Sequence, residues 1–334
     1  MRDTRLGSRR IIGFGLTSPD AARLTEFYAT AFGAQPVSSE HLSGARFERR
    51  MGVHGGALRH TLRLGREAVD ILQFDTPGRS YPRLLFPDDT AFQHFAIVVS
   101  NMDLALARLQ GVPGWTPISI GGPQRLPPGS GGVTAFKFQD PDGHPLELLA
   151  FPEHAVPPHW AERSAYGIFL GVDHSAISVR DTAISTAFYQ SLGFTVTAQT
   201  FNHGVEQANL DGVPSPHVEV TALSLAASIP HLELLCYRSG IHLPRKALSS
   251  NDVAATRIAL AADGLKNDVD ALRELAVDPD GHHLLFVPDL AAQRPPNPSR
   301  GGLGSQAVFW VRPISRATFF SHQSWAQRLW SDWW

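Results

Sequence analysis

Apolar and polar residues along the chain follow strand and helix periods that occur more than once. Residues 94–99 (HFAIVV) and 174–179 (HSAISV) have the pattern of strands, and each opens with a histidine. Each run precedes a segment with helix-like spacing of apolar residues, over Met102–Leu109 after the first and Thr182–Ser191 after the second. The pattern therefore predicts a strand followed by a helix at both places.

Two longer motifs also recur. The segment Asp140–His144 (DPDGH) has a second copy at Asp278–His282, and each copy lies between apolar runs, which is typical of a turn between two strands. The Phe-Tyr pair at residues 27–28 and the Phe-Gly pair at 32–33 correspond to Phe-Tyr at 188–189 and Leu-Gly at 192–193. Both sets predict a helix that ends near a glycine.

These repeats divide the chain into four similar units, and a repeat indicates the architecture more strongly than any local pattern. Each unit reads as a strand, a helix and several further strands. The fourth unit is the shortest and the poorest match. The units span residues 10–77, 92–152, 171–238 and 250–288.

The combined pattern resembles the vicinal oxygen chelate superfamily, which includes glyoxalase I, extradiol dioxygenases, fosfomycin-resistance enzymes and bleomycin-binding proteins. The resemblance covers residues 10–288. It implies an α+β fold of four βαβββ modules, paired into two cupped mixed β-sheets. It rests on His94, His174, the Phe-Tyr helix motifs, both Asp-Pro-Asp-Gly turns, and the strand endings Leu146–Leu149 and Leu232–Leu235 (LELL in each).

In that family a module can offer one metal ligand from its first strand and one from its last. By resemblance, the second module offers His94 and Glu147, and the third offers His174 and Glu233. Two imidazoles and two carboxylates suit one divalent ion, with nickel, cobalt, zinc, manganese and iron as the candidates.

The first and fourth modules lack a complete ligand pair. The first has Gly13 at the histidine position and Asp70 at the glutamate position. The fourth has Leu285 at the glutamate position and no clear ligand near Thr256. These two modules are therefore expected to contribute less to a metal site.

The sequence leaves two pairings of the modules open. If neighbours pair, one cup holds Asp70, His94 and Glu147, and neither cup has four ligands. If the second module pairs with the third and the first with the fourth, all four predicted ligands share one cup. We favour the second pairing, because two complete modules standing side by side would otherwise be a coincidence.

The resemblance implies a metal-dependent lyase or isomerase similar to glyoxalase I. The ion would act as a Lewis acid that stabilises an enediolate, with Glu147 or Glu233 as the catalytic base. An extradiol ring-cleaving dioxygenase is an alternative, because two histidines and one carboxylate also bind ferrous iron in oxygenases. A non-catalytic protein that binds a small molecule is a third hypothesis, and it predicts no metal.

Composition narrows the class of protein. The chain has 334 residues, 43% of them hydrophobic, which is enough for two domains. We place these domains at residues 10–152 and 171–288, with a linker at 153–170. The tail, residues 289–334, breaks the repeat and carries five of the seven tryptophans, and we expect it to be poorly ordered.

Charge and cysteine content exclude some classes of partner and favour one compartment. Lys plus Arg is 29 and Asp plus Glu is 31, so neither nucleic acid nor an anionic membrane is an expected partner. The single cysteine, Cys236, excludes a disulfide within the chain. The basic start leads into an apolar run too short for a signal peptide, so a cytoplasmic protein with a small-molecule substrate is expected. A homodimer is a further expectation from the family.

The Gly- and Pro-rich segment from Gly121 to Gly132 opens no helix and matches no phosphate-binding motif. The sequence favours a plain linker here over a loop that covers the site.

Overall fold

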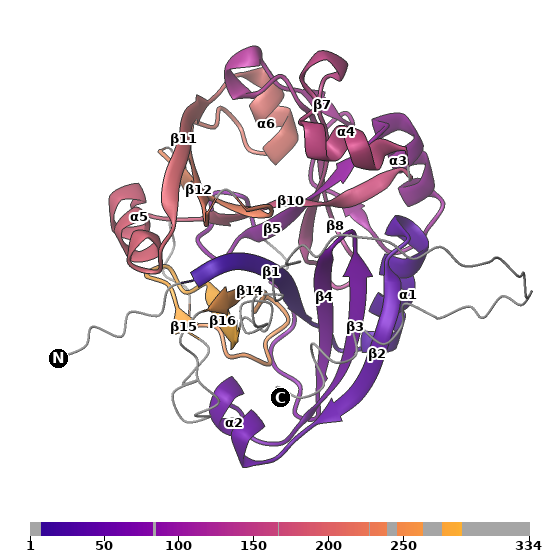
Figure 1. The fold of residues 1–334 in the computed structure, drawn as a ribbon, viewed down its shortest axis with the longest axis vertical. Helices are drawn as coiled ribbons and strands as arrows, with labels where there is room; N and C mark the ends of the chain where they lie inside the picture. Colours follow the sequence, from indigo (N-terminus) through magenta and orange to yellow (C-terminus); the bar gives the residue numbers. More distant parts are fainter. Residues whose placement is uncertain are drawn as a thin grey trace, which may run out of the picture.

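The computed structural model describes residues 8–82, 85–165, 167–226, 228–238, 246–262 and 276–288. Two mixed sheets with helices against them form the molecule, as Figure 1 shows. The α+β fold of paired modules is therefore confirmed. The predicted tail lies outside the described residues, as does part of the fourth module. No helix in the described part of the chain is both long and apolar enough to span a lipid bilayer.

The first module begins with a strand and a well-capped helix. The Asp20 side chain accepts a hydrogen bond from the backbone N–H of Arg23, and Gly33 ends the helix with a φ of 69°. The buried face of the helix, which includes Leu24 and Ala31, contributes to the main core. The elements are β1 (Ser8–Thr17), α1 (Ala21–Phe32), β2 (Gln35–Leu42), α2 (Ala45–Met51), β3 (Ala57–Leu64) and β4 (Glu67–Phe74).

The second module contains the predicted strand and helix near residues 94 and 102. Asn101 caps the helix by accepting a hydrogen bond from the backbone N–H of Leu104. Both elements extend one residue beyond their predicted bounds. The elements are β5 (Gln93–Val99), α3 (Met102–Gln110), β6 (Thr116–Pro117), β7 (Gln124–Arg125), the 3-10 turn η1 (Pro128–Ser130), β8 (Thr134–Gln139) and β9 (Pro145–Ala150).

The predicted linker between residues 153 and 170 is partly helical. It forms the 3-10 turn η2 (Glu153–Ala155) and the helix α4 (Pro158–Ser164), and then enters the first strand of the third module. Proline stands at the start of α4, where a missing backbone N–H costs nothing. This helix places the fully buried Trp160 beside the third module.

The third module repeats the order of elements of the first, and the described part of the fourth consists of strands. Asp181 caps the predicted helix at residues 182–191, and its carboxylate accepts hydrogen bonds from two backbone N–H groups. The third module contains β10 (Phe169–Ser178), α5 (Thr182–Ser191), β11 (Thr195–Asn202), α6 (Val205–Asp211), β12 (Val218–Ser224) and β13 (His231–Tyr237). The described part of the fourth contains β14 (Arg257–Ala262), β15 (Ala276–Val277) and β16 (His283–Pro288).

The modules pair in the order that we favoured, the second with the third and the first with the fourth. One sheet has the strand order β15-β16-β14-β1-β4-β3-β2, and the other β11-β12-β13-β10-β5-β9-β8-β6, with β7 paired to β8. In Figure 1 the indigo strand β1 lies beside β14 and β16, which are orange to yellow. The alternative that placed Asp70 beside His94 and Glu147 is wrong, because β4 belongs to the other sheet.

Each sheet therefore takes strands from both sides of the linker. The division of the chain into domains at residues 10–152 and 171–288 stays a prediction. These two ranges do not coincide with the two sheets.

The repeated motifs hold together modules that pair into different sheets. The second module's turn contacts the first module, where Asp142 accepts a hydrogen bond from Ser18 at 2.5 Å and pairs with Arg23. In the same turn, Asp140 accepts a hydrogen bond from the Tyr28 hydroxyl at 3.2 Å. The repeat thus marks a contact between neighbouring modules.

The fourth module's turn makes the equivalent contacts with the third. Asp280 pairs with Arg180 at 2.8 Å and accepts a hydrogen bond from Ser185 at 3.2 Å. Asp278 accepts a hydrogen bond from the Tyr189 hydroxyl at 3.0 Å. The two helix tyrosines and the two turn aspartates therefore have the same structural role in both halves of the chain.

Candidate metal centre

Sheet register brings the four predicted ligands to one face of the nine-stranded sheet. In the parallel pair β5–β9, Glu147 lies opposite Ala96, two residues after His94. In the parallel pair β10–β13, Glu233 lies opposite residue 176, two residues after His174. Side chains two residues apart in a strand share a face, so each histidine points to the same side as its glutamate.

The central strands β5 and β10 are antiparallel and relate the two ligand pairs to each other. His94 lies opposite Ala176, and His174 lies opposite Ala96. The two imidazole rings have centroids 5.9 Å apart. This local two-fold arrangement makes one cluster from two modules.

Distances within the cluster are those of groups that could share an ion. His94 Nε2 lies 3.1 Å from Glu147 Oε2, and His174 Nε2 lies 3.6 Å from Glu233 Oε2. His94, Glu147 and His174 each have one ligand atom in this cluster, and these three atoms lie within 4.8 Å of one another. His94 is buried; its Nδ1 atom has no hydrogen-bond partner among the described residues, and its Nε2 atom faces Glu147.

The cluster has an excess of carboxylates, and this sets the charge of each group. Burial lowers the pKa of His94 and favours a neutral ring. Burial would lower the pKa of His174 too, but Glu233 and Asp173 outweigh it and raise that pKa to about 9. Burial would raise the pKa of Glu147, but His94 and Lys137 hold it below its usual range.

The pKa of Glu233, the fourth candidate ligand, is lowered in the same way as that of Glu147. Burial would raise the pKa of Glu233, but the rings of His174 and His231 hold it well below its usual range. Both glutamates are therefore carboxylates at neutral pH, the form in which a metal ion binds them.

Asp173 holds the His174 ring in place. Its Oδ2 atom lies 3.2 Å from His174 Nδ1, which leaves Nε2 for the cluster. Its Oδ1 atom accepts a hydrogen bond from Trp160 Nε1 at 3.0 Å. A carboxylate on the far nitrogen of a metal-binding histidine fixes the ring orientation and tautomer. The linker helix α4 thereby reaches the candidate centre.

His231 lies between Asp173 and Glu233, which both belong to the third module. Its Nδ1 atom is 3.7 Å from Asp173 Oδ2, and its Nε2 atom is 3.4 Å from Glu233 Oε1. The third module contains two further histidines, His203 and His217, that lie outside this network. His203 and His217 are exposed and pack around Phe201.

Lys137 is a buried cation on β8, opposite Glu147 in the register. Its Nζ lies 2.7 Å from Asp211 Oδ1 and 4.0 Å from Glu147 Oε2. Burial would lower the pKa of Lys137, but these carboxylates raise it, so the side chain stays charged. Sequence reasoning missed Lys137, Asp173 and Asp211. The lysine between Phe136 and Phe138 in an apolar strand was the available signal.

Comparison with known proteins identifies a family for the first part of the chain. A model of the Glyoxalase/Bleomycin resistance protein/Dioxygenase superfamily matches residues 10–148. This part of the chain carries a domain of that superfamily. No curated protein matches the chain in sequence.

Solved glyoxalase structures share the fold across most of the chain. A mutant of glyoxalase I from Zea mays is 18% identical with a TM-score of 0.54, over 86% of this chain and 96% of that one. A further structure of glyoxalase I from Zea mays is 17% identical with a TM-score of 0.54, over 84% and 92%. At these identities the likeness shows the superfamily fold alone.

The ligand cluster lines a cavity of about 260 Å³ in the superfamily cup. The segment predicted as a plain linker forms part of its wall, since Leu126, Ser130 and Gly131 line the cavity. Ser130 in η1 donates a hydrogen bond to Asn202 in β11 at 2.8 Å. The backbone N–H of Ile120 also donates to the carbonyl of Asn209 at 2.7 Å. The interpretation as a linker is therefore corrected, because this loop joins the second module to the third across the cup.

The corresponding positions of the other sheet carry a different set of residues. Gly13 and Arg257 occupy the histidine positions, and Asp70 and Leu285 the glutamate positions. Arg257 donates to Thr17 Oγ1 at 3.1 Å from both terminal nitrogens.

Asp70 accepts a hydrogen bond from Thr61 at 2.6 Å and lies 3.7 Å from Arg59 Nη1. A guanidinium in place of an imidazole makes this sheet unsuited to the same ion.

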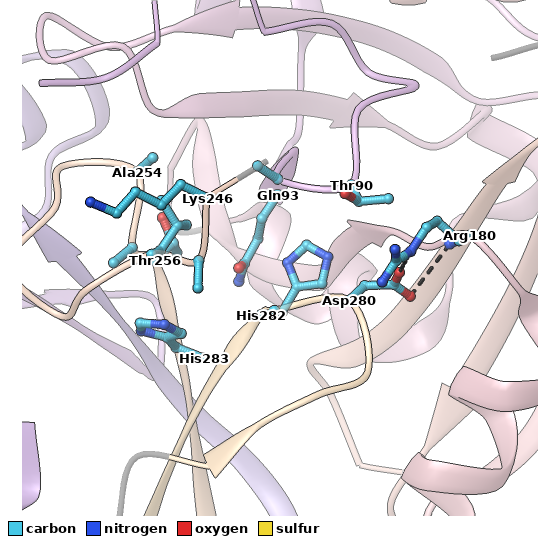
Figure 2. Close-up of a pocket in the computed structure, with 14 residues that line it drawn as sticks. Thr90, Gln93, Arg180, Lys246, Ala254, Thr256, Asp280, His282 and His283 are labelled. Carbon is cyan, nitrogen blue, oxygen red and sulfur yellow. Dashed lines mark hydrogen bonds and ion pairs between the residues drawn. The ribbon is translucent and has the colours of Figure 1, made fainter. Parts of the chain in front are cut away.

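A separate pocket of about 190 Å³ opens where β14, β16 and the start of β5 meet, and Figure 2 shows its lining. Gln93 and His283 line it, and Asp280 is its only carboxylate among the described lining residues. Because Asp280 pairs with Arg180 at 2.8 Å, this pocket lacks a cluster of metal ligands.

Proposed function

We propose that this chain is a metal-dependent enzyme of the superfamily, a lyase or isomerase similar to glyoxalase I that acts on a small oxygenated substrate. The observation that carries the proposal is the cluster of His94, Glu147, His174 and Glu233 on the wall of one cavity. Two imidazoles, of which His174 would give up its proton to the ion, and two carboxylates suit a divalent first-row ion.

The residues fit such an ion in two respects. His94 Nδ1 is buried without a hydrogen-bond partner among the described residues, and Nε2 has only the Glu147 carboxylate at 3.1 Å, which leaves the ring free to bind an ion in place of that contact. Carboxylates also outnumber cations around the cluster, where Lys137 and a protonated His174 stand against Glu147, Glu233, Asp173 and Asp211. Added positive charge would relieve this excess.

A bound divalent ion would supply Lewis-acid polarisation of a substrate carbonyl, which makes the neighbouring C–H bond more acidic. Glu233 is the better candidate for the base. Its side chain is 24% exposed against 7% for Glu147, so it has more freedom to move toward substrate. Glu233 would take the proton from one carbon and return it to the next, while His231 and His174 orient its two oxygens.

An extradiol-type dioxygenase is the second candidate. The tightest group in the cluster is His94, Glu147 and His174, which has the composition of the two-histidine, one-carboxylate site of ferrous oxygenases. Glu233 favours the lyase or isomerase, because it adds a second carboxylate on the same cavity wall. A non-catalytic binding protein is the reading that remains if no metal binds.

Metal content of the purified and reconstituted protein tests the proposal. We expect about one divalent ion per chain, lost in the double variant His94→Ala/His174→Ala. The control variant His41→Ala/His154→Ala removes two exposed imidazoles and should keep the ion. Nickel, cobalt or zinc supports the lyase or isomerase, whereas iron with ring cleavage supports the dioxygenase. A parent protein that takes no metal after reconstitution overturns both enzymatic functions.

The role of Glu233 has its own test. Glu233→Gln is expected to retain most of the ion through the remaining three ligands and to lose turnover. Glu147→Gln should lose the ion, since Glu147 belongs to the tightest group. The predicted homodimer stays a prediction.

A further inference from the structure

The cup that holds the ligand cluster is small. Its volume is about 260 Å³, below the range of roughly 300–1,000 Å³ that pockets for drug-sized ligands occupy. Aliphatic and aromatic side chains make much of the wall around the ligands. They include Leu126, Val133, Leu149, Phe151, Leu210 and Leu235. The walls therefore favour a compact body with apolar faces.

Hydrogen bonds between modules hold the wall of the cup together. Ser130 and Asn202 come from different modules, both line the cavity, and are joined by a 2.8 Å hydrogen bond. Ser119 Oγ also donates to the carbonyl of Leu210 at 2.9 Å, which ties the second module to α6. A bulky substrate that pushed these walls apart would have to break these contacts.

The charge of the cup disfavours an anion. Lys137 is the only lysine or arginine among the described residues that line the cavity, and Asp211 holds it at 2.7 Å. A divalent ion and Lys137 would bring three positive charges against the four carboxylates of Glu147, Glu233, Asp173 and Asp211. A substrate carboxylate or phosphate would therefore enter without an unpaired cation to receive it, which is costly in a buried site.

Gln207 gives the cup one open hydrogen-bond acceptor. Its Nε2 atom donates to Asp211 Oδ2 at 2.8 Å, and since a carboxylate only accepts, this contact fixes the orientation of the amide. The Oε1 atom is then the acceptor, and it is buried without a hydrogen-bond partner. Gln207 lines the cavity, so a hydroxyl group on a bound molecule would supply the missing donor.

We propose that the cup takes a compact, uncharged molecule with two adjacent oxygens, an apolar body and a further hydroxyl that donates to Gln207. This inference rests on the proposed function, because the adjacent oxygens would face the ion. It excludes peptide conjugates and carboxylated substrates as the natural class.

Binding of matched hydroxypyranones to the metal-loaded protein tests the class, with calorimetry as the readout. Kojic acid and comenate share a ring and adjacent oxygens and differ in a hydroxymethyl group against a carboxylate. We expect kojic acid to bind at least about ten-fold more tightly. Comenate that binds equally well, or S-hexylglutathione that competes with kojic acid, overturns the inference.

The Gln207 contact has a separate measure. Kojic acid should bind more tightly than allomaltol, in which a methyl group replaces the hydroxymethyl group, by about five-fold, and Gln207→Leu should abolish that preference. The exposed Gln190→Leu is the control and should keep it. A preference that survives Gln207→Leu refutes the contact.

Metal content is measured first on each sample. A parent protein without metal overturns the proposed function and this inference with it. A loaded protein that prefers comenate overturns only the inference.

Discussion

The buried His144 in the second module's turn gives the sharpest test of how the modules hold together. Its Nδ1 atom lies 2.9 Å from Asp140 Oδ2, and its Nε2 atom lies 3.0 Å from the carbonyl of Val253 and 3.1 Å from that of Thr17. All three partners are acceptors, so both ring nitrogens must carry protons. His144 is therefore an imidazolium that links three modules.

We predict that His144→Ala lowers the free energy of unfolding by about 3 kcal/mol at pH 6. Removal of one partner from a buried ion pair costs about 3–5 kcal/mol. The low end applies because Asp140 keeps the Tyr28 hydroxyl and two backbone N–H groups of its own turn. Urea unfolding followed by tryptophan fluorescence measures the loss.

The loss should shrink as pH rises. Burial would lower the pKa of His144, but Asp140 and Asp142 outweigh it and raise that pKa above the unfolded value of about 6.5. Stability from this group is then complete below about pH 6.5 and disappears as pH rises through the folded pKa. The difference between parent and variant is expected to be largest at pH 6 and smaller at pH 9.

The matched control is His282→Ala in the other turn. His282 Nε2 contacts the carbonyl of Ser178 at 2.9 Å, so one hydrogen bond to a backbone carbonyl is lost, for about 1 kcal/mol. The reasoning about His144 is refuted if its variant loses no more than this control, or if the loss does not change between pH 6 and pH 9.

Two further predictions concern the metal centre and the repeated contacts. Asp173→Asn should weaken zinc or cobalt binding by about 10–100-fold, because the carboxylate that orients His174 is lost, and Trp160→Phe should have a smaller effect in the same direction. Competition with a chromophoric chelator measures both, and unchanged affinity in Asp173→Asn would remove the positioning role. Tyr28→Phe and Tyr189→Phe should each cost about 1 kcal/mol in urea unfolding, because each hydroxyl donates to a buried turn aspartate. A difference of several kcal/mol between them would contradict their equivalent roles.

The sequence by itself determined the local elements and the ligand candidates. Strands near residues 94 and 174, helices near 102 and 182, and both Asp-Pro-Asp-Gly turns follow from short-range patterns, because periodicity and turn chemistry act within a few residues. The same patterns placed His94, Glu147, His174 and Glu233 at matching positions of two modules, and those residues meet on one cavity wall.

Only the tertiary structure decided which modules pair. The contact between β5 and β10 is between strands of different modules, and no local pattern distinguishes it from a contact between β1 and β5. The same holds for Arg257, whose place at a histidine position follows from the register of β1 with β14.

The structure also decided the surroundings of the candidate centre, for a physical reason. In an alternating strand, polar residues such as Lys137 and Glu147 ordinarily face solvent. Here the polar face of the sheet and the loop that contains Ser130 line one cavity. The polar side chains of that face therefore become part of a buried wall. Burial converts those side chains into a paired network, and burial depends on contacts between modules that lie far apart in the sequence.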